Sequence, residues 1–350
     1  MKRYYTRVCN FYYGKESELL VNKKKSIPLN GNKKLSFDHI EIITRNSKKT
    51  FHIQNINSLN RLLKNKIKSD LKKIKLKKKN FANLSFSKIP NVMGILNLTP
   101  DSFSDGGKFN KNNEGLKHAL KMLEAGANII DVGGESTRPG SKAINNKLEW
   151  KRIEKFIKSA NKKIPISLDT RKSDIMKKGI KYGVKIINDV SGLNYDIETI
   201  NVLKKYKISF VLQHSKGIPE NMQNKPYYKN ELLDIYDYFE KKIKFLRSIG
   251  VMHNNIIIDP GIGFGKNLKH NMNLISNISI FHSLGLPILV GNSRKKFIKE
   301  ISGKNDSKNR IGGTVASSIY LMMQGVQILR VHDVNELLQG VKVFKELINR

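Results

Sequence analysis

The sequence is poor in cysteine, in long apolar runs and in acidic residues. Cys9 is the only cysteine among 350 residues, so neither a disulfide nor a cysteine-rich zinc cluster can form within one chain, and a reducing compartment fits. No apolar run is long enough to span a bilayer, and the basic N-terminus has no apolar segment behind it. We therefore expect a soluble, cytoplasmic protein without an export signal.

The shortage of acidic residues leaves a formal charge of +36, from 65 basic and 29 acidic residues. Such a balance can indicate nucleic acid or an anionic membrane as a partner. The excess is concentrated at the start, because residues 1–89 hold 23 basic and 5 acidic residues. Asparagine and isoleucine are abundant beside lysine, and no nucleic-acid recognition motif is present, which favours a compositional bias. We expect neither a nucleic-acid partner nor a membrane partner.

Residues 1–89 differ from the rest and are interpreted as a small basic N-terminal extension of unknown role. Two short strands are predicted at 40–44 and 50–53, and 58–79 begins as a helix before it dissolves into lysines. These lysines have no interleaved aromatic residues that could stack nucleic-acid bases, so a solvated linker is preferred. The extension is therefore expected to be removable without loss of folding or activity.

Residues 90–350 alternate short apolar segments with amphipathic ones and are interpreted as one domain. Apolar residues at three- and four-residue spacing predict helices at 114–125, 148–160, 173–182, 231–249, 271–284, 310–323 and 335–348. Strands are predicted at 92–98, 127–132, 165–169, 184–190, 208–213, 255–259, 287–290 and 326–331. Strands that alternate with helices pair in parallel, so the pattern predicts an α/β fold, a closed (β/α)8 TIM barrel, with an open doubly wound sheet as the alternative.

Polar residues gather at the carboxyl ends of the predicted strands and not at their amino ends. They are Asn97; Asp131 with Glu135; Asp169; Asn188 with Asp189; Gln213 with His214; Asp259; Ser293, Arg294 and Lys295; and Arg330 with His332. Any one of them could cap a helix or a turn. Barrel enzymes build their active sites at the carboxyl-terminal mouth, so the whole set predicts an active site there.

Five motifs on these strand ends resemble those of the dihydropteroate synthase family. They are 97–107 (NLTPDSFSDGG), 131–140 (DVGGESTRPG), 259–266 (DPGIGFGK), 291–295 (GNSRK) and 330–334 (RVHDV). The resemblance covers residues 91 to about 345, and its motifs are long and in order, which makes it far more specific than a lone glycine motif. It implies a pterin-binding transferase of folate (tetrahydrofolate) biosynthesis. Such an enzyme condenses 6-hydroxymethyl-7,8-dihydropterin diphosphate with para-aminobenzoate, giving 7,8-dihydropteroate and pyrophosphate.

The resemblance also implies roles for single residues. The residues that contact the pterin diphosphate would be Thr137, Asp169, Asn188, Asp259, Lys295, Arg330 and His332. The residues that line the para-aminobenzoate pocket would be Phe103, Arg138, Pro139 and Ser293. The catalytic residues would be Asp101, Lys295, Arg330 and His332. The metal would be Mg²⁺ with Asn97 as a ligand, because this ion keeps water and substrate oxygens as its other ligands.

The chemistry of the reaction suits these residue types. A pterin has an edge of N–H donors and a carbonyl, which fit a carboxylate, amides and a cation in a dry pocket. Departure of the diphosphate leaves positive charge on the pterin methylene, so the site must stabilise the departing anion. Arg330 follows the last strand, where barrel phosphate sites are common, and arginine can bind phosphate through two N–H groups. The aromatic amine is neutral at physiological pH, so no strong general base is required.

Several questions stay open at this level. Many family members carry a small hydroxyl residue where this chain has Lys296, so the binding of the aminobenzoate carboxylate is one of them. The aminobenzoate residues fall on loops rich in Gly, Ser and Pro that no packed element is expected to hold, which predicts that this substrate binds second. The alternative functions are a pterin-binding methyltransferase barrel and a basic RNA- or membrane-surface-binding protein built on a barrel. A homodimer is one candidate assembly.

Overall fold

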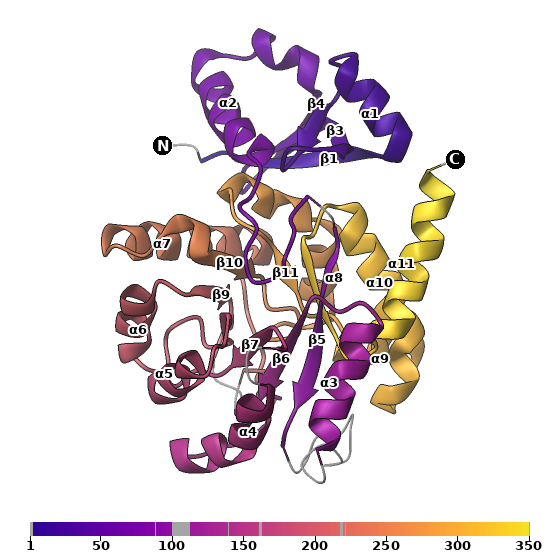
Figure 1. Cartoon of the computed structure of the whole chain (residues 1–350). Coiled ribbons are helices and arrows are strands. Elements are labelled where there is room, and N and C mark those ends of the chain that lie inside the picture. The colour runs from indigo at the N-terminus through magenta and orange to yellow at the C-terminus, as the bar shows by residue number, and fades with distance from the viewer. Residues whose placement is uncertain are drawn as a thin grey trace.

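The structure is a computed structural model that describes residues 3–87, 89–99, 113–138, 140–160, 163–217, 220 and 222–349. Figure 1 shows two parts stacked along one axis: a small N-terminal α/β part and a larger barrel below it. The C-terminus lies beside the N-terminal part. The two parts are joined by extensive contacts, so the N-terminal part is built into the structure and is not a free arm.

An antiparallel sheet flanked by helices forms the N-terminal part. Its elements are β1(Tyr5–Tyr13), α1(Gly14–Asn22), β2(Ile27–Leu29), β3(Asn32–Ile43), β4(Lys48–His52) and α2(Arg61–Lys75). Strand β3 is central, pairing with β1 on one side and with β2 and β4 on the other. The two predicted strands are thereby confirmed as the hairpin of β3 and β4. Helix α2 begins where the Asn60 side chain accepts a hydrogen bond from the Leu63 N–H.

A hydrophobic core of its own stabilises the N-terminal part. It consists of Val8, Leu29, Leu35, Phe37, Ile40, Ile42, Ile56, Ile67, Leu71 and Ile74. The three α2 members repeat at helical spacing, so the lysines between them lie on the outer faces of the helix. The expectation of a solvated linker is therefore wrong for the helical part of the lysine run, where a short apolar stripe is hidden among the charges.

Eight parallel strands close into the barrel. They are β5(Asn91–Asn97), β6(Ile129–Gly133), β7(Ile166–Asp169), β8(Ile186–Asp189), β9(Ser209–Gln213), β10(Ile256–Asp259), β11(Leu289–Val290) and β12(Ile328–Val331). Their order is β10-β9-β8-β7-β6-β5-β12-β11, and a parallel bridge between Ile258 and Ile288 brings the two end strands together. The eight predicted strands and the TIM barrel are confirmed, because an open doubly wound sheet would leave its end strands apart.

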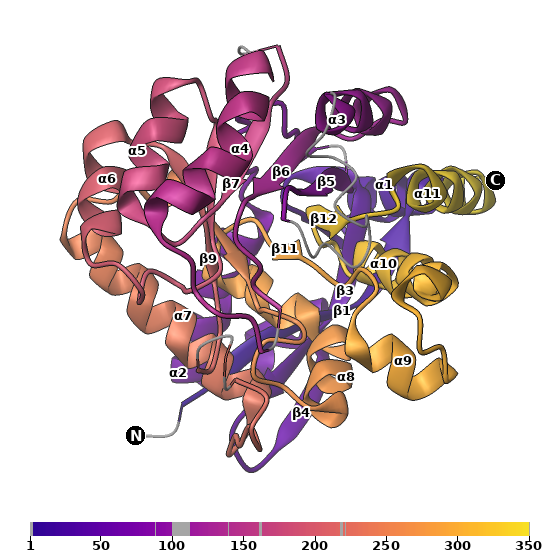
Figure 2. The ribbon, with the colours of Figure 1, turned by 90° about the horizontal axis from the view of Figure 1, so that it is seen from below.

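Helices surround the barrel (Figure 2). They are α3(Glu114–Glu124), α4(Asn146–Ala160), α5(Ser173–Lys181), α6(Glu198–Tyr206), α7(Glu231–Ser248), α8(Leu268–Ser276), α9(Lys296–Ser302), α10(Ile311–Met323) and α11(Val334–Ile348). Helices α6 and α9 were not predicted. Helix α9 has only 7 residues, which is too short for a periodic pattern, whereas α6 has 9 residues, as many as the predicted α5. The helix predicted at 271–284 is divided at Asn277 into α8 and a 3₁₀ helix, η4(Ile278–Leu284).

Side chains that point into the barrel form two layers of opposite character. The layer near the amino ends of the strands is apolar and consists of Met93, Ile129, Ile186, Val211, Ile257, Leu289 and Ile328. Alternate residues of a strand face the same side of a sheet, so a second layer lies two residues further along the strands. That layer is polar and includes Asp131, Asn188, Gln213, Asp259 and Arg330. Two residues along a strand therefore separate the apolar core from the polar mouth of the barrel.

The amino-terminal end of the barrel is closed by the segment that precedes it. Leu84 and Phe86 are each 1 % exposed and pack into the apolar inner layer. The N-terminal sheet then covers this end, where the Tyr5 ring meets Tyr236 edge to face at 5.2 Å and the Ser279 hydroxyl donates to the Val8 carbonyl at 2.7 Å. The N-terminal extension and the barrel therefore share part of one core.

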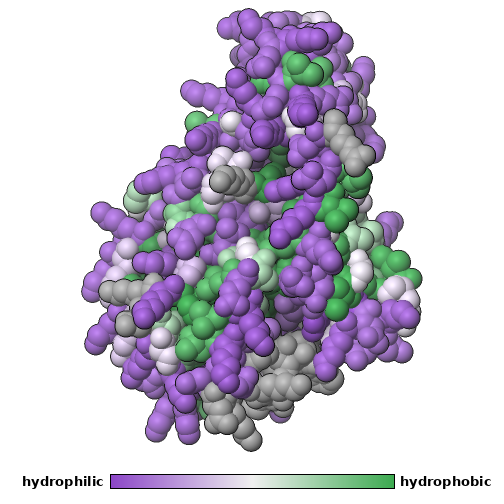
Figure 3. All heavy atoms as spheres, turned by 45° about the vertical axis from the view of Figure 1, so that its right-hand side comes forward, coloured by the Kyte–Doolittle hydropathy of each residue, from purple (hydrophilic) through white to green (hydrophobic). Residues whose placement is uncertain are grey.

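Hydrophilic side chains cover most of the face drawn in Figure 3, with smaller hydrophobic areas between them. Within the described part of the chain, none of the helices is both long enough and apolar enough to cross a membrane.

Candidate active site

Figure 2 looks toward the carboxyl-terminal mouth of the barrel. This mouth holds a ring of buried polar groups. Arg330, on β12, donates from Nε to Asp131 Oδ2 at 2.6 Å and from Nη2 to Asp169 Oδ2 at 2.8 Å. Asn188, at the end of β8, donates from Nδ2 to the same Asp131 oxygen at 2.9 Å. Four strands therefore place two carboxylates, an amide and a guanidinium in mutual contact.

Three side-chain oxygens of this ring take no part in these hydrogen bonds. Asp131 Oδ1, Asp169 Oδ1 and Asn188 Oδ1 are buried and have no hydrogen-bond partner among the described residues. Buried acceptors are almost always paired in folded proteins, and an unpaired one costs about 1–3 kcal/mol. Three of them on one ring are suited to a ligand edge that carries several N–H donors. Burial also raises the pKa of Asp169, against the opposing effect of the Arg330 guanidinium.

Asp259 and Lys295 add a second pair of opposite charges. The Gly261 N–H donates to Asp259 Oδ1 at 2.7 Å. Burial raises the pKa of Asp259 to about 6, although this N–H and the nearby cations favour the carboxylate. Burial lowers the pKa of Lys295 to about 8, and its ammonium lies 4.3 Å from the ring centre of Phe264. Near pH 7 both groups therefore carry their charge inside the protein.

A cavity of about 850 Å³ opens above this ring. Among its lining residues are Asn97, Thr137, Arg138, Phe264, Ser293, Lys295, Arg330 and His332. These residues come from the ends of β5, β6, β10, β11 and β12, which are far apart in the sequence but meet at one mouth because the strands are parallel. The cavity is large enough for two small substrates side by side.

Ser293 and His332 form a hydrogen-bonded pair in the cavity wall. The Ser293 hydroxyl lies 3.0 Å from His332 Nδ1 and accepts a hydrogen bond from the His332 backbone N–H at 3.2 Å. Burial lowers the pKa of His332 well below its usual value of 6.5, helped by neighbouring cations, so the ring is neutral. Behind this pair, Arg294 forms a two-bond ion pair with Asp333, which joins the loops after β11 and β12.

The residues predicted for the site fall into two groups. Those in the described ranges lie at the mouth, either in the cavity lining or in the buried ring beneath it: Asn97, Thr137, Arg138, Asp169, Asn188, Asp259, Ser293, Lys295, Arg330 and His332. Asp101, Phe103 and Pro139 lie outside the described residues. Arg330 was expected to bind phosphate, yet in this structure two of its N–H groups bind carboxylates. Arg330 therefore lies where the buried ring meets the cavity.

Two residues of the mouth were missing from the predicted set. Asp131 was noted as a strand-end acid but given no role, although its contacts hold both Arg330 and Asn188. Lys266 is 3 % exposed, and its Nζ lies 3.1 Å from His214 Nδ1 and 2.9 Å from the Phe264 carbonyl. Burial lowers its pKa to about 7. The sequence signal for both was their place in a motif at a strand end, not their residue type.

Lys296, which replaces the expected small hydroxyl residue, begins helix α9 and lines the cavity. Its side chain is 73 % exposed, and Nζ lies 3.2 Å from Glu300 Oε1, one helical turn away. This ion pair is at the surface and is worth little in stability. The substitution therefore places an exposed cation at the rim of the cavity.

Comparison with known proteins places this fold and site in a class. Residues 93–332 match the family described as "Pterin binding enzyme". The barrel with its polar mouth is thus that of a pterin-binding enzyme, and the N-terminal part lies outside the matched range.

The relatives narrow the class to one family. Dihydropteroate synthase of Escherichia coli K12 is 38% identical over 262 residues, which cover 74% of this chain and 92% of that protein. The enzyme of Synechocystis is 39% identical over 254 residues, covering 72% and 88%. The chain belongs to the dihydropteroate synthase family, whose members are transferases.

Solved structures agree with this assignment. The Yersinia pestis dihydropteroate synthase, solved with a sulfonamide drug, has a TM-score of 0.73 and 38% identity, covering 76% of this chain and 97% of that one. The Xanthomonas albilineans enzyme, solved with 4-aminobenzoic acid, has a TM-score of 0.70 and 33% identity, covering 75% and 94%.

Proposed function

We propose that this protein is a cytoplasmic dihydropteroate synthase that joins 6-hydroxymethyl-7,8-dihydropterin diphosphate to para-aminobenzoate, yielding 7,8-dihydropteroate and pyrophosphate. The observation that carries the proposal is the ring of buried acceptors that find no hydrogen-bond partner among the described residues at the mouth of the barrel. A reduced pterin presents several N–H donors along one edge, so it would satisfy these acceptors together. The family membership and the cavity for two substrates support the same conclusion.

The pterin ring would lie on the buried layer. Asp259, ionised near pH 7, accepts two parallel N–H bonds from the donor edge, and Asn188 and Asp169 meet the neighbouring positions. Lys295 reaches the carbonyl side as a cation, with its ammonium over the Phe264 ring. An analogue without the donors would leave a buried charge unpaired, so this pocket discriminates strongly for pterins.

The diphosphate would lie across the cavity wall formed by Thr137, Ser293 and His332. The Ser293 hydroxyl can donate to Nδ1 of the neutral His332 ring while it accepts from the backbone N–H. In that arrangement the ring proton is on Nε2, which becomes a donor for a phosphate oxygen. Arg330 adds positive charge between the pterin and the diphosphate, where negative charge grows as the diphosphate departs.

A Mg²⁺ ion fits the residues present. The described residues contain no group of three His, Cys, Asp or Glu side chains placed to hold a metal. Asn97, the half-buried last residue of β5, offers one hard amide oxygen at the cavity, which suits an ion whose other ligands are water and substrate phosphate. When bound, Mg²⁺ would neutralise charge on the diphosphate.

The condensation itself needs few groups from the protein. The carbon–oxygen bond to the diphosphate breaks and its electron pair leaves with the diphosphate. The aromatic amine then forms the new carbon–nitrogen bond to the methylene and loses one proton to solvent. Arg138, Ser293 and, by family resemblance, Phe103 and Pro139 would hold the aminobenzoate for this attack. Asp101 would stabilise the positive methylene.

A continuous assay for pyrophosphate release tests the proposal. We expect release only when the pterin diphosphate, para-aminobenzoate and Mg²⁺ are all present, with one pyrophosphate for each dihydropteroate. Omission of the aminobenzoate is the control for simple hydrolysis. A pterin-binding methyltransferase would bind the pterin but release no pyrophosphate, and an RNA-binding protein would do neither. Either result would refute the proposed function.

A further inference from the structure

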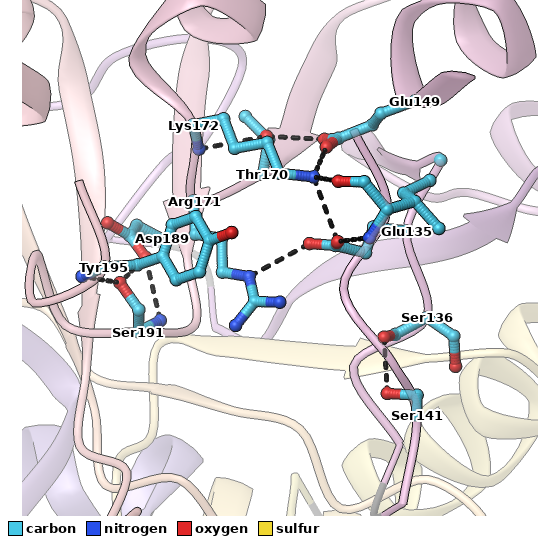
Figure 4. A network of polar contacts seen from close by, with 12 residues as sticks. Glu135, Ser136, Ser141, Glu149, Thr170, Arg171, Lys172, Asp189, Ser191 and Tyr195 are labelled. Carbon is cyan, nitrogen blue, oxygen red and sulfur yellow. Dashed lines mark hydrogen bonds and ion pairs between the residues drawn. The ribbon is translucent and has the colours of Figure 1, made fainter. Parts of the chain in front are cut away.

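Buried charges lie beneath the loop that joins β6 to α4, in a cluster of Glu135, Glu149, Arg171 and Lys172, which we term the clasp (Figure 4). Each of the four is at most 6 % exposed. Two are acidic and two are basic, so the cluster is formally neutral. None of them belongs to the substrate-contacting set described above, yet burial of four ionisable side chains is costly unless their bonds are complete.

The Lys172 ammonium and every carboxylate oxygen of the clasp have hydrogen-bond partners. Lys172 Nζ donates to Glu135 Oε1 at 2.9 Å, to Glu149 Oε2 at 2.6 Å and to the Ile144 carbonyl at 2.6 Å, which uses all three of its N–H groups. The second oxygen of Glu149 accepts from the Thr170 hydroxyl at 2.6 Å. Burial raises the pKa of Glu149, whereas for Glu135 the bonds outweigh burial and lower its pKa.

The clasp joins the two ends of the β6–α4 loop. Glu135 stands at the start of the loop and its Oε1 accepts the N–H of Ile144, near the end, at 2.8 Å. Lys172 binds both of these partners, and Arg171 holds the other Glu135 oxygen at 3.0 Å. Within the loop, the Ser141 hydroxyl donates to the Ser136 carbonyl at 2.7 Å (Figure 4). It also lies 2.7 Å from the Arg138 carbonyl. Hydrogen bonds and ion pairs therefore join the two ends of the loop, and further hydrogen bonds link residues within it.

The loop whose ends the clasp joins forms part of the cavity wall. Ser136, Thr137 and Arg138 line the cavity, and all three lie between the residues that the clasp joins. This finding corrects the expectation that no packed element holds the aminobenzoate loops, as far as the second loop is concerned. Its sequence is rich in Gly, Ser and Pro, but its ends are held by charges contributed from α4 and from the segment after β7.

We propose that Glu135 and Lys172 are positioning residues, which hold Thr137 and Arg138 in their substrate-binding places before any ligand arrives. The proposal rests on the proposed function for the identity of the substrates. A loop that is already ordered loses little conformational entropy when a ligand binds. It therefore favours binding of para-aminobenzoate and of the diphosphate. The pterin ring, by contrast, would be bound by Asp169, Asn188 and Asp259, whose described hydrogen bonds involve no clasp side chain.

The test uses Glu135→Gln and Lys172→Met, which keep the size of each side chain and remove its charge. In each variant we expect KM for para-aminobenzoate to rise at least tenfold and kcat to fall less than threefold. Affinity for 6-hydroxymethylpterin, which lacks the diphosphate, should stay within twofold of the unaltered protein. In the unliganded protein, hydrogen exchange of the Ile144 amide should speed up at least tenfold in Glu135→Gln, because its acceptor is weakened.

Glu41→Gln in the N-terminal part is the matched control, because Glu41 is also buried and accepts from Arg7 Nε at 2.7 Å. This variant should melt at a lower temperature with KM unchanged. If Lys172→Met does not fold, the double variant Glu135→Gln with Lys172→Met restores neutrality and takes its place. A parallel fall of every parameter, as in a merely destabilised protein, or an unchanged KM would overturn the proposal. If the unaltered protein binds no pterin, the proposed function fails instead, while the exchange of Ile144 still tests the clasp.

Discussion

The two ends of the barrel are built from the same strands and have opposite properties. At the amino-terminal end, Ile129 and Ile257 pack with Phe86 in a dry layer. Two residues further along the same strands, Asp131 and Asp259 lie in a charged layer. The dry end has its apolar surface covered by the N-terminal part, whereas the charged end keeps acceptors that have no partner within the described part of the chain. Stability and ligand binding are therefore separated by about 7 Å along a strand.

The charged end lowers the stability of the folded protein, and the dry end compensates for it. Buried carboxylates with raised pKa values, such as Asp169 and Asp259, reduce the stability of the folded state near neutral pH. The apolar layer and the N-terminal part offset this cost. Changes at the dry end should therefore lower stability without altering binding, and changes at the mouth should weaken binding without lowering stability.

The largest effect should come from removal of the N-terminal part. A chain that begins at Ser85 loses Leu84 and exposes the surface that Tyr5 and Val8 cover, so we expect insoluble protein or a melting temperature lower by about 10 °C or more. This reverses the expectation from the sequence. A chain that begins at Tyr4, which keeps β1 whole, is the control. A soluble, fully active shortened chain would show that the barrel closes unaided.

A single change at the dry end should have a smaller but clear effect. Phe86→Ala removes a ring that is 1 % exposed and should lower the free energy of unfolding by about 3–5 kcal/mol, as measured by denaturant titration. The rate kcat/KM, measured well below the melting temperature, should stay within twofold. Phe86→Leu, which leaves less empty space, should lose less stability. A large fall in kcat/KM would show that the two ends are coupled.

At the mouth, Asp259→Asn should show the opposite pattern. Loss of a charge-assisted pair should weaken pterin binding by about 2 kcal/mol or more in calorimetry. The free protein should become more stable near pH 8, by about 1–3 kcal/mol, because the variant no longer buries an ionised carboxylate. Near-normal pterin affinity would exclude Asp259 from the pocket. Reduced stability would show that its bond from Gly261 matters more than its burial.

The pH dependence should be the smallest effect and should separate binding from stability at one residue. The pKa of Asp259 is raised from 3.8 to about 6 in the folded protein. Its contribution to stability is therefore present below pH 3.8 and lost as the pH rises through 6. Its contribution to pterin binding needs the ionised form and falls as the pH drops below 6, by at most tenfold per pH unit. Titrations from pH 3.5 to 8 measure both, and Asp259→Asn should remove the part of each dependence that falls between pH 3.8 and 6.

Much of the barrel was predictable because its signal is local. Eight apolar runs with polar residues at their carboxyl ends identify the strands, and parallel pairing brings those ends to one mouth wherever the strands lie in the sequence. The N-terminal part was harder to predict, because Ile67, Leu71 and Ile74 are separated by lysines and only packing shows that they form a core. The lysine-rich composition hides a short apolar stripe.

The eight strands, the class of fold and the residue types at the mouth follow from the amino-acid sequence alone. Which of these residues bond to one another depends on how the chain folds in three dimensions. Arg330 binds Asp131 and Asp169 across 199 and 161 positions of the chain. Lys172 likewise joins the two ends of a loop from another strand. Local patterns fix secondary structure because they act over a few residues, whereas the pairing of buried charges depends on distances that exist only once the barrel has closed.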